Sequence, residues 1–162
     1  MSAVRFREAT AADVGLILQF IRALAEYEKM SGDVIATEEI LREWLFEKQS
    51  ARVIFAMEGE KEVGFALYFY NFSTFLGRAG LYLEDLFVLP EYRGCGYGKG
   101  LLAHLAAIAV EKGCGRMEWV CLDWNKPSID FYRSKNAVPL EDWTIYRLTG
   151  DTLTAFAKED KV

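Results

Sequence analysis

The chain has 162 residues, of which 52% are hydrophobic and 27% charged, and its net charge is −5. This length fits one domain with a sizeable core, the acidic balance disfavours nucleic-acid binding, and no apolar run is long enough for a membrane helix. The single histidine and the three cysteines without a C-x-x-C pair argue against a metal site and a disulfide framework, and they suit a reducing cytoplasm. We therefore expect one cytoplasmic domain over residues 1–162, with no metal and no membrane or nucleic-acid partner.

The first half of the chain predicts a strand, two helices and a hairpin. Residues 4–9 alternate between apolar and polar, as in a strand, and Thr10 with Asp13 gives a capping pattern at the start of a helix. A second helix is expected to begin at Thr37 with four residues facing inward: Ile40, Leu41, Trp44 and Leu45. Residues 52–72 hold two β-rich runs joined by a Glu-Gly-Glu-Lys turn, which is typical of a hairpin.

The second half predicts strand, helix, strand, helix and strand. Residues 80–89 form a strand that Pro90 stops, and helical periodicity then continues from Leu101 to Gly113. Residues 116–124 form the next strand, a short helix opens near Pro127, and residues 143–148 are expected to close the sheet. This order indicates a mixed α/β domain.

A glycine-rich stretch, "PEYRGCGYGKGLL" (residues 90–102), lies between strand and helix. Backbone N–H groups at a helix start have no partner inside the helix, and glycines let a phosphate approach them closely. The stretch is not a Walker loop, because Gly98-Lys99 is followed by Gly100, and its period-two spacing does not fit G-x-G-x-x-G. Taken alone, it leaves a flexible turn open as the alternative.

Two motifs together resemble the GNAT acyltransferase superfamily. Arg93-x-x-Gly96-x-Gly98 matches the signature R/Q-x-x-G-x-G/A, and "NKPSIDFY" (residues 125–132) resembles the segment N-x-x-[AS]-x-x-[FL]-Y. Nearly the whole chain is similar to the branch of spermidine/spermine and thialysine acetyltransferases, through segments such as "LAEYEKM" and "LYLEDLFVLPEYRG". The resemblance implies a mixed, mostly antiparallel sheet of six to seven strands, splayed at the acetyl-CoA site and flanked by about four helices.

The resemblance also implies a set of acetyl-CoA contacts. Backbone groups of three strand residues would pair with the pantetheine, one N–H would polarise the thioester carbonyl, and the glycine loop would hold the pyrophosphate. The implied cofactor-binding residues are Leu86, Phe87, Val88, Arg93, Gly94, Cys95, Gly96, Tyr97, Gly98, Lys99, Asn125 and Ser128.

The implied chemistry is direct attack of a primary amine on acetyl-CoA. Tyr132 would donate a proton to the leaving thiolate, and Glu84 is the candidate base for the amine. Glu84 and Asp85 are consecutive in a strand, so their side chains are expected on opposite faces. Tyr27 and Glu28 match amine-lining positions of the branch and, with Glu84 and Asp85, make up the expected substrate site. The structural alternatives are a core tyrosine for Tyr132, an ion-paired edge carboxylate for Glu84 and a solvated helix end for Tyr27 and Glu28.

The chain departs from the family pattern at two places. Lys135-Asn136-Ala137 stands where a glycine usually ends the helix, and asparagine is the next-best residue for a left-handed cap. The loop of residues 70–80 lacks the acidic residue and tryptophan of the polyamine enzymes, whereas "LDWN" with Asp123 is closer to the thialysine type. Either a diamine or polyamine or a thialysine-like amino acid therefore fits as substrate.

Two other functions stay open on sequence grounds, namely an acetyl-CoA sensor without turnover and a protein-lysine acetyltransferase. By resemblance we also expect a homodimer, with the apolar region from Trp143 to Phe156 as an interface.

Overall fold

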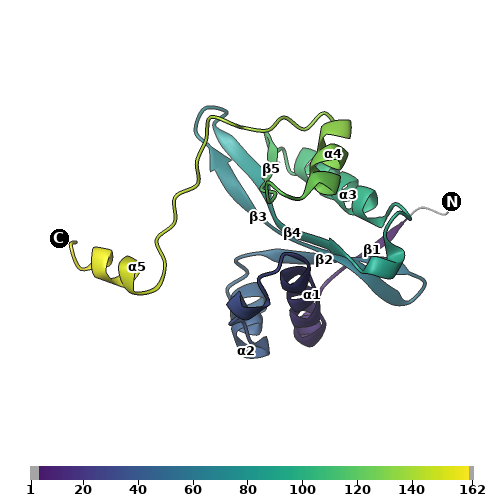
Figure 1. Cartoon of the computed structure of the whole chain (residues 1–162), viewed down its shortest axis with the longest axis horizontal. Helices are drawn as coiled ribbons and strands as arrows, with labels where there is room; N and C mark the ends of the chain where they lie inside the picture. Colours follow the sequence, from purple (N-terminus) through teal and green to yellow (C-terminus); the bar gives the residue numbers. More distant parts are fainter. Residues whose placement is uncertain (1–3, 161–162) are drawn as a thin grey trace. The chain divides into compact units, whose positions relative to one another are not determined.

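The computed structural model describes residues 4–160 of the chain and divides it into two compact units, Met1–Val120 and Cys121–Val162 (Figure 1). The first unit carries one five-stranded sheet in the order β1-β2-β3-β4-β5. Its strands are β1 (Arg5–Glu8), β2 (Arg52–Glu58), β3 (Lys61–Ser73), β4 (Arg78–Val88) and β5 (Met117–Trp119). Neighbours from β1 to β4 pair antiparallel and β4 pairs parallel to β5, so the expected mixed, mostly antiparallel sheet is confirmed.

The helices of the first unit cover both faces of this sheet. They are α1 (Val14–Tyr27), α2 (Glu38–Leu41), which continues into a π-helical turn (Arg42–Glu47), and α3 (Tyr97–Glu111). Short 3₁₀ turns lie at Ala11–Asp13, Ser31–Asp33 and Pro90–Tyr92. On one face Phe20 of α1 stacks on Phe65 of β3, with ring centroids 5.1 Å apart. On the other face, a Cβ added at the preceding residue of β3, Gly64, would lie 3.3 Å from Leu101 of α3.

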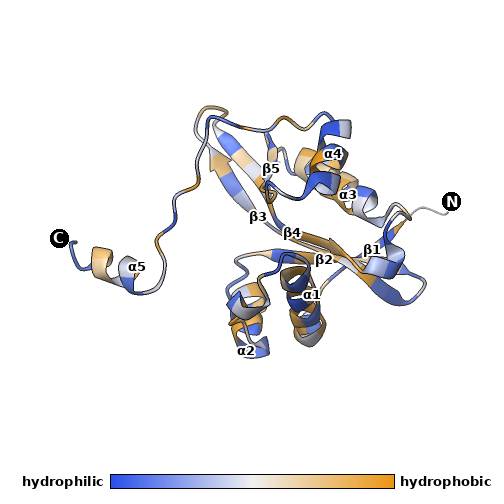
Figure 2. Ribbon diagram, viewed as in Figure 1, coloured by the Kyte–Doolittle hydropathy of each residue, from blue (hydrophilic) through white to orange (hydrophobic). Residues whose placement is uncertain are grey.

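The hydrophobic core lies on both faces of the sheet. Figure 2 shows the hydrophobic residues concentrated in the central strands, where five consecutive residues of β2 are buried. Phe55 and Phe65 are fully buried and belong to the cluster beneath α1, whereas Leu101 and Leu105 are the fully buried residues of α3. A central strand flanked by helices on both faces buries both of its sides.

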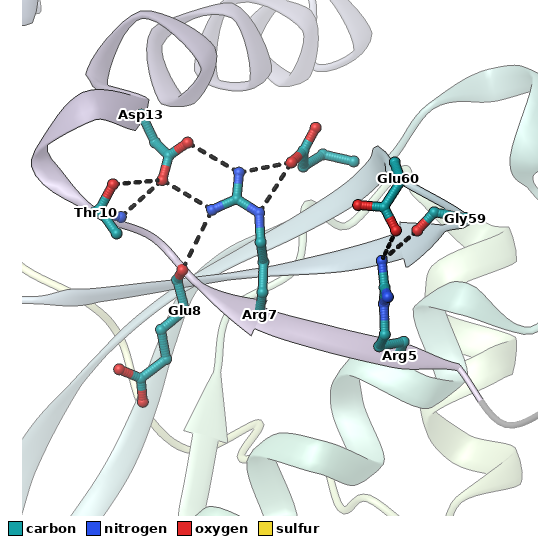
Figure 3. Close-up of polar contacts among 8 residues, drawn as sticks. Arg5, Arg7, Glu8, Thr10, Asp13, Gly59 and Glu60 are labelled. Carbon is teal, nitrogen blue, oxygen red and sulfur yellow. Dashed lines mark hydrogen bonds and ion pairs between the residues drawn. The ribbon is translucent and has the colours of Figure 1, made fainter.

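An arginine-centred network joins β1, β3 and the start of α1 (Figure 3). Arg7 donates to Asp13 at 2.9 Å and to Glu62 at 2.6 Å, and its guanidinium lies 4.7 Å from the ring centroid of Phe55. The Asp13 carboxylate also accepts from the backbone N–H of Thr10 at 2.7 Å, as the capping pattern predicts. Hydrogen bonds from Arg7 lower the pKa of Asp13 to about 2. The network thereby fixes the first turn of α1 against the sheet.

The second unit contains α4 (Lys126–Ser134) and α5 (Gly150–Ala157). Asn136 follows α4 with φ 61°, so the asparagine takes the left-handed position that a glycine usually occupies. Among residues 4–160, no helix is long and apolar enough to cross a membrane.

Three expectations about the fold are wrong: the closing strand, the numbers of strands and helices, and the inward face of the second helix. Residues 143–148 form no strand and are exposed, so the described residues contain five strands rather than six or seven, and five α-helices where about four were expected. A strand needs a neighbouring edge, and within residues 4–160 the segment pairs with none. Ile40 and Trp44 are exposed at 44% and 49%, because the buried stripe of α2 and the π-helical turn follows Leu41 and Leu45.

Candidate functional site

The strand β4 parts from β5 at the point where the resemblance implies the acetyl-CoA site. Residues 81–83 of β4 pair with residues 117–119 of β5, and within the described chain no pairing to β5 continues over residues 84–88. On its other side β4 stays paired to β3 up to Val88. One edge of residues 84–88 is therefore left without a neighbouring strand.

Backbone groups alternate along this free edge. The N–H of Leu89 donates to Val63 of β3, whereas the carbonyl of Val88 accepts from the Arg93 side chain at 3.0 Å. In an antiparallel strand successive residues direct their backbone groups to opposite sides. Leu86 and Val88 therefore face away from β3, and Phe87 bonds to β3 opposite Phe65. Of the three strand residues expected to meet pantetheine, Leu86 and Val88 direct their backbone groups to the free edge, whereas those of Phe87 face β3.

A β-bulge lies at Glu84. The pairing shifts register between Leu67, opposite Asp85, and Tyr68, opposite Leu83, which leaves Glu84 as the extra residue of β4. A bulge breaks the strict alternation of side chains. Strand alternation therefore does not fix the relative directions of the Glu84 and Asp85 side chains, and the charge of Glu84 contributes to the raised pKa of Asp85.

Asp85 is the carboxylate with the most perturbed proton affinity in the site. Burial, together with the negative charges of Glu84 and Glu28, raises its pKa to about 7. Burial also raises the pKa of Glu28, the residue that caps the C-terminus of α1. Within residues 4–160, neither Glu84 nor Asp85 forms an ion pair, so the lysine or arginine partner that was the structural alternative for Glu84 is not present there. Sequence reasoning had singled out Glu84, which is exposed, over Asp85.

Arg93 joins the loop to the aromatic side chains next to these carboxylates. Its guanidinium carbon lies 4.9 Å from the ring centroid of Tyr27 and 5.0 Å from that of Phe87. The two rings meet edge to face with centroids 6.4 Å apart. The spacing of the motif placed Arg93 in the loop, but only the folded chain brings it to Tyr27, at the end of α1.

The glycine-rich loop opens α3 as expected. Gly94 and Gly96 have φ of 77° and 91°, and nothing lies within 4 Å of a Cβ built at either position. The positive φ explains the glycines, since other residues rarely adopt it, and the open space leaves room for a ligand. A glycine is needed at position 100 for a different reason, because a Cβ built there would lie 3.2 Å from Val4. The open N-terminus of this 15-residue helix fits a pyrophosphate, as binding of acetyl-CoA requires.

The other loop residues divide by exposure. Cys95 and Lys99 are exposed, whereas the side chain of Tyr97 is buried and meets the ring of Tyr92 edge to face. Tyr97 can therefore offer a ligand its backbone but not its ring. Gly98 has room for a methyl group, since a Cβ there would lie 3.8 Å from the nearest atom, which belongs to Val88.

The remaining predicted residues lie in the second unit. Asn125 is buried and caps α4, where its side-chain oxygen accepts from the backbone N–H of Ser128 at 3.4 Å. The asparagine of the motif thus has a structural role in starting the helix. Tyr132 lies in the last turns of α4, half-buried, with its ring 5.7 Å from that of Phe131.

The chain is similar to known acetyltransferases over most of its length. Residues 18–136 match the model of the acetyltransferase (GNAT) family. A thialysine N-epsilon-acetyltransferase of Bos taurus is 40% identical over 97% of this chain and 99% of its own length. An L-ornithine N5-acetyltransferase of Arabidopsis thaliana is 32% identical over 95% of this chain and 88% of its own.

A solved structure has the same fold. An integron cassette protein from the mobile metagenome of V. cholerae superposes with a TM-score of 0.80 and 31% identity, over 98% of this chain and 99% of that one. The match to the family model and the two relatives explain why the strand β4 parts from β5 and why a glycine loop opens α3. The chain belongs to the acetyltransferase (GNAT) family.

Proposed function

We propose that the protein is an acetyl-CoA-dependent N-acetyltransferase for a primary amine of a small cationic substrate. The observation that carries this proposal is the group of carboxylates at Glu28, Glu84 and Asp85, which adjoins the free edge of β4. A substrate ammonium would relieve their mutual repulsion, and its neutral form is the nucleophile. Membership in the GNAT family supports acetyl-CoA as the second substrate.

Acetyl-CoA would supply an acetyl group activated as a thioester. The backbone N–H groups of the glycine loop, from Gly94 to Lys99, would hold the pyrophosphate at the start of α3. The backbone groups of Leu86 and Val88 would bond pantetheine along the free edge, and one N–H there would polarise the thioester carbonyl. From the second unit, we assign Asn125 and Ser128 to the pantetheine arm.

The carboxylates and Tyr132 would then move the protons of the reaction. The substrate ammonium gives its proton, through water, to the pair formed by Glu84 and Asp85, and the amine forms the new C–N bond directly. The C–S bond breaks as Tyr132 gives a proton to the thiolate that leaves, and the second proton that the nitrogen loses passes through solvent and restores the phenol. No acyl-enzyme forms on the way. Two interacting carboxylates titrate as a pair, so we assign the proton to the pair formed by Glu84 and Asp85. Variants of each residue would show which of the two accepts it.

The substrate class follows from charge and from the relatives. Tyr27 and Glu28 would line the amine site beside Asp85 and select a cation. The names of the bovine and Arabidopsis relatives point to amino acids that carry a second, terminal amine. We therefore place a thialysine-like amino acid first and a diamine or polyamine second.

We further propose one catalytic domain that includes both units, since the family match runs across their boundary from residue 18 to residue 136. Within residues 4–160, the cysteines Cys95, Cys114 and Cys121 form no disulfide, which suits work in the reducing cytoplasm. A homodimer through the apolar region from Trp143 to Phe156 completes the proposal.

The first test is thiol release from acetyl-CoA with a panel of amines: thialysine, lysine, ornithine, putrescine, spermidine, spermine and a lysine-containing peptide. We expect turnover with a small amine. Tyr132→Phe should lower kcat at least tenfold, because general acid catalysis contributes roughly 10²–10⁴. Tyr146→Phe, which changes a 91% exposed tyrosine, is the matched control and should keep wild-type rates. Acetyl-CoA binding without turnover would support a sensor, and turnover with the peptide alone would support a protein acetyltransferase.

A further inference from the structure

The side chain of Arg93 leaves the loop to which its backbone belongs. Its Nε donates to the carbonyl of Val88, and its guanidinium lies against the rings of Tyr27 and Phe87. Within residues 4–160, it forms no ion pair with a carboxylate. The cation is thus held by one carbonyl and two aromatic faces.

The backbone of Arg93 is tied to the anion-binding loop. Its N–H donates to Pro90 at 3.2 Å, and the next residue, Gly94, already has the positive φ of the loop. A pyrophosphate that binds the N–H groups of this loop would fix the backbone on both sides of Gly94. The direction in which the guanidinium leaves the loop would be fixed with it.

The far end of the contact lies in the amine site. Tyr27 is the last residue of α1, and Glu28 caps that helix through its N–H to Leu24. Phe87 is two residues from Asp85 on β4, so both point to the same face of the sheet. A guanidinium that holds both rings sets the end of α1 relative to this part of β4, and with it the distance between the carboxylates of Glu28 and Asp85.

We propose that Arg93 is a positioning residue that couples the pyrophosphate loop to the amine site, so that the amine binds more tightly once coenzyme A is bound. This inference rests on the proposed function and adds to it an energetic coupling between the two substrates. Because the coupling of two sites is reciprocal, a bound amine must tighten coenzyme A by the same factor. A single partly exposed cation–π contact limits the size of the effect, and we expect roughly three- to tenfold.

The test measures four affinities in wild type and in Arg93→Met. Calorimetry gives the Kd of coenzyme A with and without the best amine of the panel, and the Kd of that amine with and without coenzyme A. In the wild type we expect the amine to bind about three- to tenfold more tightly with coenzyme A present. In Arg93→Met this ratio should fall to about one, the Kd of coenzyme A alone should change less than about twofold, and the amine KM should rise while kcat is kept.

Five further variants distinguish a positioning role of Arg93 from an effect of charge alone or of misfolding. Lys99→Met removes an exposed cation from the same loop and should weaken coenzyme A without changing the ratio. Tyr27→Phe keeps the ring and should keep the ratio, and Arg93→Lys should recover part of it. Tyr27→Leu should lose it, and Arg93→Met with Tyr27→Leu should be no worse than either alone. Melting temperatures check that all of the variants are folded.

The outcomes distinguish this inference from the function on which it rests. A wild type that turns over no amine overturns both. A wild type that turns over an amine, with the same affinity ratio in Arg93→Met, overturns only the coupling. A tenfold loss of coenzyme A affinity in Arg93→Met, with the ratio unchanged, would show that the guanidinium serves the phosphate.

Discussion

At the scale of single residues, the buried carboxyl of Asp85 has a cost in stability, which its proposed role in the amine site would explain. Its pKa of about 7 lies well above the ordinary 3.8, because burial and two negative neighbours disfavour the charged form. Above pH 4 the unfolded chain carries this carboxyl ionised, whereas the folded chain keeps the proton until about pH 7. This group therefore lowers the free energy of unfolding as the pH rises from about 4 to about 7, and the loss persists above pH 7.

Asp85→Asn should accordingly stabilise the protein at pH 8 and not at pH 4. The difference between the two pKa values corresponds to roughly 4 kcal/mol, and exposure of part of the carboxyl reduces the expected gain to about 2 kcal/mol. Urea unfolding at pH 4, 6 and 8 measures the effect. Glu84→Gln is the control, because it removes one repulsive neighbour and keeps the buried carboxyl, and its gain at pH 8 should be smaller. An equal difference between Asp85→Asn and wild type at all three pH values would contradict the assignment.

At the scale of elements, the glycines of the loop before α3 differ in their backbone conformation. Gly96 has a positive φ that other residues rarely adopt, whereas Gly98 does not. Gly96→Ala puts a Cβ at φ 91° and should cost about 1–2 kcal/mol of stability, and it should also weaken coenzyme A. Gly98→Ala places a methyl group inside the helix with ordinary contacts, so stability should rise by up to about 1 kcal/mol. Thermal melts and calorimetry with coenzyme A test the pair. Equal losses in both variants would show that the loop needs flexibility rather than one special conformation.

The sequence correctly predicted those elements that depend on neighbouring residues alone. Alternation and periodicity located the hairpin and α3, and the capping pattern of Thr10 and Asp13 is present as hydrogen bonds. The features that the sequence did not predict depend on residues far apart along the chain. The bulge at Glu84 is a property of the pairing with β3, and the contact of Arg93 with Tyr27 joins residues 66 positions apart along the chain. The spacing of a motif predicts which backbone meets a ligand but not where a long side chain goes.

At the scale of the whole molecule, the C-terminal region exposes several large apolar side chains. Its helix α5 has eight residues, and isolated helices shorter than about 12–15 residues are marginal in water. Leu153 and Phe156 on this helix are exposed at 51% and 59%, and Trp143 before it at 79%. The pattern of residues 143–148 favours a strand, yet within residues 4–160 the segment pairs with none of the five strands. A second copy of the chain that covers these residues would account for both observations.

The proposed homodimer predicts that Ile145→Glu yields a monomer. Ile145 is 67% exposed in the single chain, and a carboxylate there would be buried without a partner in a dimer, at a cost of several kcal/mol. Light scattering after size exclusion, at two concentrations, should give the mass of two chains for the wild type and of one for the variant. Thr144→Glu adds the same charge at the neighbouring exposed residue, which would point to the other side of a strand, and should remain a dimer. A wild type with the mass of one chain at both concentrations would remove the dimer, and α5 would then have to be stabilised by its own chain.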